Sequence, residues 1–278
     1  MKKIIMLVLV VAATMNYTNA QTKNTKMTNK EKVTAIIKSV ETGDTTAASL
    51  YINPKKYIQH NAGAPDGIQG FYGFIKYKPA NGYKTNVVRV FEDGNYVFTH
   101  SEGVIYGAKI FFDVFRFENG LIVEHWDNMQ TTETTSKSGH SMIDGTIKAS
   151  DLKKTADNKK LIQAMYANIF IGGDLTKIDT YISSEKYIQH NPGSPDGKDA
   201  FAYMMKMAKE QFWFKVNKTH LVLAEGDFVL VQSEGVMGGK DATFYDLFRV
   251  ENGKVVEHWD VIEPATPKEQ WKNTNGKF

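Results

Sequence analysis

An internal repeat constrains the fold of this 278-residue chain more than any other feature. The pentapeptide Tyr-Ile-Gln-His-Asn at residues 57–61 recurs at 187–191, and Glu-His-Trp-Asp at 124–127 recurs at 257–260. The offset drifts only from 130 to 133 positions, as short insertions in loops would produce. A repeat of more than a hundred residues is too long for a solenoid. The sequence therefore predicts two tandem copies of one domain.

The repeat also suggests where the domains begin and end. We predict one domain at residues 28–130 and a second at 158–266. A polar segment at 131–157, rich in Thr, Ser, Lys and Gly, is typical of a linker between them. Residues 267–278 are then a C-terminal tail.

The first twenty residues have the pattern of a cleavable signal peptide. Lys2 and Lys3 precede an apolar run at 4–13, and a polar stretch ends at Ala20. We therefore expect cleavage after Ala20 and a periplasmic or secreted protein. The apolar run is too short to cross a hydrocarbon core of about 30 Å as a helix, so we expect no membrane span after cleavage.

Composition excludes several classes of function. Without Lys2 and Lys3, 32 Lys and Arg residues face 31 Asp and Glu residues, and the basic residues are scattered among acidic ones. Because nucleic-acid binding needs a basic face, we expect no nucleic-acid partner. The chain has no cysteine, which excludes disulfides and thiol chemistry, so a packed core must hold the fold together.

Each copy places helical patterns before strand patterns. A Thr28-x-x-Glu31 capping box precedes a helical stripe that ends at Gly43. The apolar positions of the predicted helices are Val33, Ile36, Ile37 and Val40; Phe71, Phe74 and Ile75; Leu161, Met165 and Ile169, ending at Gly172 and Gly173; and Phe201, Met204, Met205 and Ala208. Strands are expected at 84–92, 96–105, 109–118, 121–128, 215–224, 228–237, 241–251 and 254–262.

Helices followed by antiparallel hairpins predict an α+β fold, in which the helices pack on one face of a curved antiparallel sheet. Such a sheet can enclose a small-molecule pocket.

The register of the last hairpin in each copy decides which residues would face that pocket. A two-residue Asn-Gly turn would pair Asp113 with Trp126 and place His125 on the opposite face. A three-residue Glu-Asn-Gly loop would pair Asp113 with His125, and Phe111 with Asp127. We favour the second register, which gathers both aspartates and the histidine on one face and leaves Arg116 and Glu124 on the other.

The resulting polar cluster is a candidate site for acid/base chemistry. Buried carboxyl groups next to an imidazole can exchange protons near neutral pH. The candidate catalytic residues are Asp113, His125, Asp127 and His60 in the first copy and Asp246, His258, Asp260 and His190 in the second. The candidate ligand-lining residues are Tyr57, Phe111 and Phe115 in the first copy and Tyr187, Phe244 and Phe248 in the second.

Simpler roles compete with these assignments. Trp126 and Trp259 fit core or interface positions, and Asp66 and Asp196, in the Pro-Asp-Gly turns, fit helix caps. The aspartate–histidine cluster could be a structural network or a binding site. A metal site is a third option for two Asp and two His per copy. We expect no metal, since no HxH or HExxH spacing occurs.

Several motifs together resemble the SnoaL-like branch of the nuclear transport factor 2-like superfamily. More closely, the chain is similar to bacterial proteins grouped as SnoaL-like aldol condensation-catalysing enzymes. The resemblance covers residues 28–278. It is carried by the pentapeptide with Pro-Asp-Gly, the hairpin Tyr-Asp-Leu-Phe-Arg-Val-Glu-Asn-Gly at 245–253, Glu-His-Trp-Asp-Val-Ile at 257–262, Met-Ile-Asp-Gly at 142–145, Asp-Leu at 151–152 and the tail at 271–278.

The resemblance implies two tandem cone-shaped α+β barrels of the cystatin-like kind, each with a deep pocket and paired within the chain or as a homodimer. It implies aldol-type cyclase, isomerase or lyase chemistry on a small hydrophobic carbonyl compound, without metal or cofactor. The aspartate on the last strand, Asp127 or Asp260, would be the acid/base. Asp113 and Asp246 stand where the polyketide cyclases have histidine. The alternative is a non-catalytic protein that binds a small ligand. Copy two is closer to the family pattern.

Overall fold

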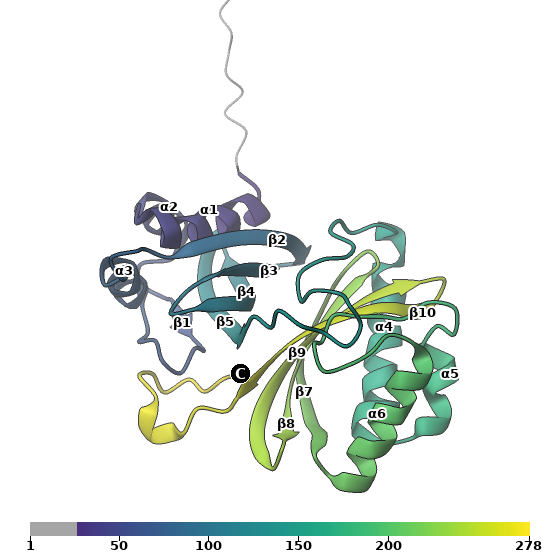
Figure 1. Cartoon of the computed structure of the whole chain (residues 1–278). Coiled ribbons are helices and arrows are strands. Elements are labelled where there is room, and N and C mark those ends of the chain that lie inside the picture. Colours follow the sequence, from purple (N-terminus) through teal and green to yellow (C-terminus); the bar gives the residue numbers. More distant parts are fainter. Residues whose placement is uncertain (1–26) are drawn as a thin grey trace, which may run out of the picture.

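The structure, a computed structural model, describes residues 27–278, so the predicted signal peptide at 1–20 lies outside the described residues. Two sets of helices and strands lie next to each other (Figure 1). In each set the helices precede the four long strands in the sequence and cover a five-stranded sheet. The α+β prediction is confirmed. Among residues 27–278, no helix has both the length and the apolar character that a membrane crossing requires.

Helix α1 (Asn29–Thr42) forms as its sequence predicts. Thr28 and Glu31 make both hydrogen bonds of the capping box, and Gly43 ends the helix in the left-handed conformation that glycine adopts without strain. The four predicted apolar positions, Val33, Ile36, Ile37 and Val40, are all buried.

The first unit continues with α2 (Thr46–Tyr51), β1 (Ile58–Gln59) and α3 (Ile68–Lys76), followed by β2 (Lys84–Asp93), β3 (Tyr96–Val104), β4 (Ala108–Glu118) and β5 (Leu121–Thr131). The sheet has the order β1-β5-β4-β3-β2. Its four long strands are antiparallel, whereas the short β1 pairs with β5 in parallel. The predicted strands are confirmed to within a few residues at each end.

The second unit repeats this topology. It comprises the 3₁₀ turn η1 (Leu152–Lys154), α4 (Thr155–Met165), the π-helical turn η2 (Tyr166–Ile171), η3 (Leu175–Lys177), α5 (Ile178–Tyr181), β6 (Ile188–Gln189), α6 (Lys198–Gln211), β7 (Phe214–Glu225), β8 (Phe228–Met237), β9 (Lys240–Glu251) and β10 (Lys254–Pro264), followed by η4 (Lys268–Gln270). The strand order β6-β10-β9-β8-β7 is that of the first sheet.

The predicted loop of the last hairpins is wrong, although the predicted grouping of side chains is right. Asn119 and Gly120 form a two-residue turn with positive φ angles of 50° and 78°, and Glu118 pairs with Leu121. A bulge at Val123 then shifts the register by one residue, so that Asp113 pairs with Asp127. The extra residue restores the face that the two-residue turn alone would have reversed.

The second hairpin repeats this geometry. Glu251 pairs with Lys254 across Asn252 and Gly253, and the register shifts between Val255 and Glu257. As a result, Asp246 pairs with Asp260.

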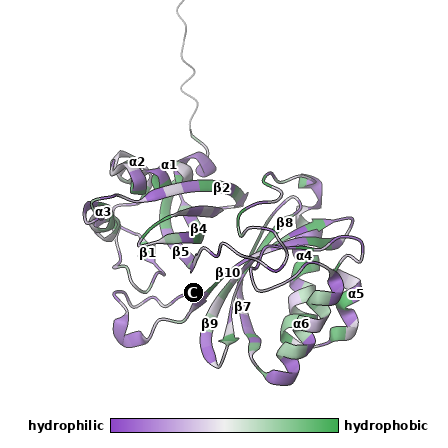
Figure 2. Ribbon diagram, viewed as in Figure 1, coloured by the Kyte–Doolittle hydropathy of each residue, from purple (hydrophilic) through white to green (hydrophobic). Residues whose placement is uncertain are grey.

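The outer faces of the two sheets pack against each other. One hydrophobic cluster contains residues of both units, including Phe98 and Trp126 of the first and Leu247 and Trp259 of the second. The predicted core or interface role of Trp126 and Trp259 is therefore confirmed. Hydrophobic residues (green) lie along the strands and helices, whereas the turn at η4 is largely hydrophilic (Figure 2).

Equivalent ion pairs flank this interface on both sides. Lys30 of α1 contacts Glu225 at the end of β7, at 2.5 Å, and Lys159 of α4 contacts Asp93 at the end of β2, at 2.8 Å. Each lysine therefore bridges to the corresponding acidic residue of the other unit, as in the reciprocal contacts of a two-fold interface.

The segment between the units packs against protein rather than crossing solvent. Arg89 of β2 is buried, and its guanidinium donates to the carbonyl oxygens of Ile143, Asp144 and Thr146. It also lies 4.4 Å from the ring centroid of Trp259. The predicted linker at 131–157 includes the start of α4, since that helix begins at Thr155.

Candidate functional site

Asp246, His258 and Asp260 form a buried cluster on neighbouring strands of the second unit. Asp246 lies on β9, whereas His258 and Asp260 lie two residues apart on β10 and therefore point to the same face. His258 Nε2 is 3.0 Å from Asp246 Oδ1, and a donor atom from each of the three residues lies within 4.8 Å of the others. The structure thus brings together the three predicted residues of this hairpin.

The hydrogen bonds of Gln189 fix the tautomer of His258. Gln189 Oε1 accepts from the backbone N–H of Asn191 at 3.0 Å, so this atom is an oxygen. His258 Nδ1 lies 2.9 Å from the same oxygen and must carry a proton to bond with it. His258 Nε2 is therefore the nitrogen that can exchange a proton with Asp246.

Tyr166 completes the chain of hydrogen bonds behind Asp246. Its hydroxyl lies 2.6 Å from Asp246 Oδ2. Burial raises the pKa of the Tyr166 hydroxyl well above its usual value, and the charge of Asp246 adds to this effect. Tyr166 thus stays protonated and donates to the carboxylate.

Asp260 has a different environment from Asp246. The side-chain amide of Asn191 donates to both of its oxygens, at 3.0 and 2.7 Å. Burial raises the pKa of the Asp260 carboxyl to about 6; His258 opposes this increase and Asp246 adds to it. A carboxyl group with such a pKa can both accept and release a proton near neutral pH.

The predicted ligand-lining aromatic residues of both units are buried, and four of them, Tyr57, Phe115, Tyr187 and Phe248, belong to the cores that support the helices. Phe248 stacks on His258 at 4.7 Å, and Phe115 stacks on His125 at 4.6 Å. Phe244 packs edge-on against Phe214 at 5.2 Å. The predicted lining residues that remain are Phe111, Tyr57 and Tyr187.

The Tyr187 hydroxyl is buried and makes no hydrogen bond of good geometry among residues 27–278. Burial raises its pKa, and the charges of Asp260 and Asp246 raise it further. Together they outweigh the nearby side chain of Gln189, which lowers the pKa, so the hydroxyl keeps its proton. The cluster thus contains a donor that a bound oxygen atom could engage.

The first unit contains a matching but different cluster. His125 bonds to Asp113 Oδ1 at 3.1 Å and to Gln59 Oε1 at 3.0 Å, while Asn61 donates to Asp127 Oδ2 at 2.7 Å. Burial raises the pKa of Asp113. Asp113 also accepts a long hydrogen bond of 3.4 Å from the Thr99 hydroxyl.

Two residues distinguish this first cluster. Ile37 occupies the position of Tyr166 in the buried helical stripe, since Val33, Ile36, Ile37 and Val40 correspond to Ile162, Met165, Tyr166 and Ile169. In addition, Lys277 Nζ lies 3.8 Å from Asp127 Oδ1.

The structure places His60 and His190, which we grouped with the candidate catalytic residues, on the opposite face of each sheet from the aspartates. His60 stacks on Trp126 at 4.7 Å and bonds to Glu124 at 2.9 Å. His190 stacks on Trp259 at 4.6 Å and bonds to Glu257 at 3.1 Å. Both histidines therefore lie on the outer side of their sheets.

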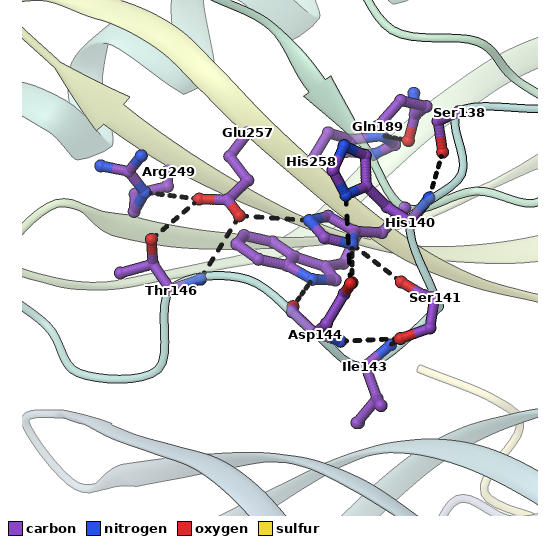
Figure 3. A network of polar contacts seen from close by, with 12 residues as sticks. Ser138, His140, Ser141, Ile143, Asp144, Thr146, Gln189, Arg249, Glu257 and His258 are labelled. Carbon is purple, nitrogen blue, oxygen red and sulfur yellow. Dashed lines mark hydrogen bonds and ion pairs between the residues drawn. The ribbon is translucent and has the colours of Figure 1, made fainter.

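Glu257 is the centre of this outer network (Figure 3). Arg249 Nε donates to the Glu257 carboxylate at 2.7 Å. The Thr146 hydroxyl donates to the same carboxylate at 3.0 Å. Burial alone would raise the pKa of Glu257, but the hydrogen bonds from His190 and Arg249 outweigh it and lower the pKa to about 2. In the first unit, Arg116 donates to Glu124 at 2.6 Å, on the outer face as predicted.

Sequence reasoning missed Gln59, Asn61 and their counterparts in the second pentapeptide. The signal was present, because alternate residues of an extended segment share a face. Tyr57, Gln59 and Asn61 belong to the side of the cluster, whereas His60 points to the other side. No comparable signal exists for Tyr166, because its position in the apolar stripe of the helix predicts only a core residue.

The prediction that Asp66 and Asp196 cap the following helices is wrong. Gly67 and Gly197 are the N-caps of α3 and α6, and no side chain caps either helix. Asp66 Oδ1 instead accepts the backbone N–H of Gln59, and Asp196 Oδ1 that of Gln189, both at 2.8 Å. The two aspartates therefore close the loops that carry the amide residues of each cluster.

Each cluster offers ligand types that could hold a metal ion, two carboxylates and one imidazole. The same residues also form hydrogen bonds to Tyr166, Gln189 and Asn191 in the second unit. A metal ion between Asp246 Oδ1 and His258 Nε2 would displace the hydrogen bond that joins these two atoms. A hollow that the structure does show lies elsewhere, between the two units, with Phe91, Leu223 and Phe228 among its lining residues.

Residues 160–271 match the family model described as SnoaL-like polyketide cyclase, so this part of the chain forms a SnoaL-like domain. No curated protein matches the chain.

Solved structures with a similar fold include an NTF2-like protein of unknown function from Cytophaga hutchinsonii, at 18% identity, 38% coverage of this chain, 94% of the other and a TM-score of 0.34. An NTF2-like protein of unknown function from Mesorhizobium loti is 16% identical over 40% of this chain and 93% of the other, with a TM-score of 0.35. An LEH-like epoxide hydrolase from M. tuberculosis is 17% identical over 40% of this chain and 85% of the other, with a TM-score of 0.33.

Proposed function

We propose that the second unit is a cofactor-independent acid/base site that acts on a small hydrophobic carbonyl compound. The observation that carries this proposal is the pairing of Asp260, a buried carboxyl group with a raised pKa, with the chain Tyr166–Asp246–His258. The match of this part of the chain to SnoaL-like polyketide cyclases supports the same class of reaction.

In the proposed reaction, Asp260 removes a proton from the carbon next to the carbonyl group. The electron pair of the broken C–H bond forms an enolate, whose oxygen accepts a hydrogen bond from the Tyr187 hydroxyl. Protonation at another carbon completes an isomerisation. In an aldol reaction, the enolate carbon instead attacks a second carbonyl carbon, and the resulting alkoxide takes the proton back.

Tyr187, rather than His190, takes this role. His190 is on the outer face of the sheet, stacked on Trp259 and bonded to Glu257, so it is not available to a substrate at Asp260.

We assign the catalytic role to the second unit rather than to the first. Asp127, the equivalent of Asp260, has a lysine beside it, since Lys277 Nζ lies 3.8 Å from its Oδ1. The first unit also lacks the tyrosine that holds Asp246. We propose that the first unit is a second SnoaL-like barrel that pairs with the catalytic one, and that the protein acts outside the cytoplasm after removal of residues 1–20.

The test replaces Asp260 by Asn, which keeps the shape of the side chain and removes the base. We expect the wild type to exchange α-protons of some members of a panel of cyclic ketones and aromatic β-diketones in D₂O, followed by ¹H NMR. The Asp260→Asn variant should lose this exchange while its ligand-induced shifts persist. Asp127→Asn, at the equivalent position of the first unit, is the matched control and should keep the exchange.

A binding function without catalysis is the second candidate. The polar atoms of Asp246, His258 and Asp260 are already satisfied within the protein, as in a structural network. Mass spectrometry of small molecules that copurify with the protein would identify a bound ligand. Exchange that continues unchanged in Asp260→Asn would rule out the catalytic assignment.

A further inference from the structure

Two short segments cross between the units in a reciprocal way. Residues 137–141, which follow the first sheet, lie on the loop after β6 in the second unit. Residues 272–276, which follow the second sheet, return to the loop after β1 in the first unit, as the yellow tail in Figure 1 shows. The backbone N–H of Lys137 donates to the Pro192 carbonyl at 3.0 Å, and that of Lys272 donates to the Ala62 carbonyl at 2.8 Å.

The motif histidines bind the same two segments. His190 Nδ1 lies 2.8 Å from the Ser141 carbonyl oxygen, and His60 Nδ1 lies 2.9 Å from that of Gly276. A carbonyl oxygen can only accept, so each Nδ1 carries a proton. The proposed reaction does not use the histidines of the pentapeptides, and these contacts give them a role.

A third pair of contacts reaches the aspartates that close the loops. Asn275 Nδ2 donates to Asp66 Oδ1 at 2.6 Å and to the Gln59 carbonyl at 3.0 Å. His140 Nε2 lies 3.1 Å from Asp196 Oδ2. The two segments thus make the same three contacts at equally spaced positions. The corresponding residues are Lys137 and Lys272, His140 and Asn275, and Ser141 and Gly276.

These loops carry the amide side chains that hold each polar cluster. In the first unit Gln59 bonds to His125 and Asn61 to Asp127; in the second Gln189 bonds to His258 and Asn191 to Asp260. A segment that fixes the loop therefore fixes the imidazole and the carboxylate through it. Because the segments are exchanged, each cluster depends on chain that belongs to the other unit.

We propose that residues 137–141 and 272–276 are reciprocal positioning elements, each of which holds the pentapeptide loop, and through it the polar cluster, of the other unit. The two clusters are therefore coupled parts of one molecule rather than independent sites. Calling the clusters sites rests on the proposed function, but the test below measures loop geometry and needs no turnover.

The first experiment replaces Asn275 by Ala in the full chain. Amide hydrogen exchange of residues 59–67 should become about tenfold faster, the factor expected from the loss of one or two hydrogen bonds. Residues 189–197 should not change. The slowly exchanging Nδ1 proton of His125, seen by ¹H–¹⁵N NMR, should broaden while that of His258 stays. Thr274→Ala, an exposed neighbour in the same segment, is the matched control and should leave both loops unchanged.

Swapping the residue types of the two segments tests whether slow amide hydrogen exchange can be restored. Asn275→His introduces the residue that occupies this position in the other segment, and should keep exchange of residues 59–67 near the wild-type rate. His140→Ala should accelerate residues 189–197 instead, by a smaller factor because His140 makes one hydrogen bond to its loop and Asn275 makes two, and His140→Asn should restore them. The proposal fails if Asn275→Ala leaves residues 59–67 unchanged, loosens both loops equally, or if neither swap restores protection.

Discussion

At the residue scale, the two clusters differ by the groups around equivalent aspartates. Asp246 accepts a hydrogen bond from Tyr166, whereas the first unit has Ile37 in that position of the helix and only a long contact from Thr99 to Asp113. Lys277 approaches the carboxylate of the first unit alone. One backbone geometry can therefore place equivalent aspartates in different surroundings.

The raised pKa of Asp260 makes folding stability depend on pH. Its folded-state value of about 6 exceeds the unfolded value of about 4, so the folded protein binds the proton more tightly. The stabilisation is fully present below about pH 4 and is lost as the pH rises through about 6, a loss of about 3 kcal/mol.

Urea unfolding of the wild type and Asp260→Asn at several pH values between 4 and 7 measures this effect. The difference between the two proteins isolates Asp260, because every other titrating group is common to both. We expect the wild type to lose stability relative to the variant as the pH rises. Parallel curves would contradict the raised pKa.

At the element scale, the segment between the units fits its site closely at Gly145. This residue has a φ angle of +90°, and a Cβ atom there would lie 2.2 Å from Glu257 Oε1 and 2.9 Å from His190 Nε2 and Trp259 Cζ2. The backbone therefore approaches the outer network as closely as a glycine allows.

Gly145→Ala should displace this segment and lower stability by about 3 kcal/mol, from backbone strain and steric overlap together. Gly139→Ala is the control, because Gly139 also has a positive φ angle of 84° but open space around it. It should cost only the strain, about 1 kcal/mol. Thermal unfolding followed by circular dichroism compares the two, and equal losses would mean that the overlap at Gly145 relaxes freely.

At the scale of the whole molecule, the packed outer faces of the sheets lead us to expect that the two units unfold together. Phe91 of the first unit stacks on Phe228 of the second at 4.5 Å within the shared hydrophobic cluster. The ion pairs of Lys30 with Glu225 and of Lys159 with Asp93 also join the two units, one on each side of this interface.

Phe91→Ala should cost about 3–5 kcal/mol, as is usual for a large buried aromatic side chain, and should destabilise both units together. Calorimetry should show one transition at a lower temperature, and hydrogen exchange should rise in β2 and β7 alike. Phe74→Ala, at a partly exposed position on α3, should cost much less. Two separate transitions, with only the first shifted, would show that the units fold independently.

Much of the fold could be predicted because its signals are local. The capping box at Thr28, the stop at Gly43 and the alternation of the strands each depend on neighbours within a few residues, and these elements form as expected. The composition of the polar cluster was also predictable, because His258 and Asp260 must share a face of any strand.

Three features were decided only by the tertiary structure. The bulges at Val123 and Val256 set the register, since an extra residue is stabilised by packing on both sides of the sheet and leaves no mark in the local pattern. The partners of His60 and His190 on the outer face, Trp126 and Trp259, were decided by the pairing of β1 with β5 and of β6 with β10. The repeat itself was evident from the sequence, but its crossed segments were not, because their hydrogen bonds join residues far apart in the chain.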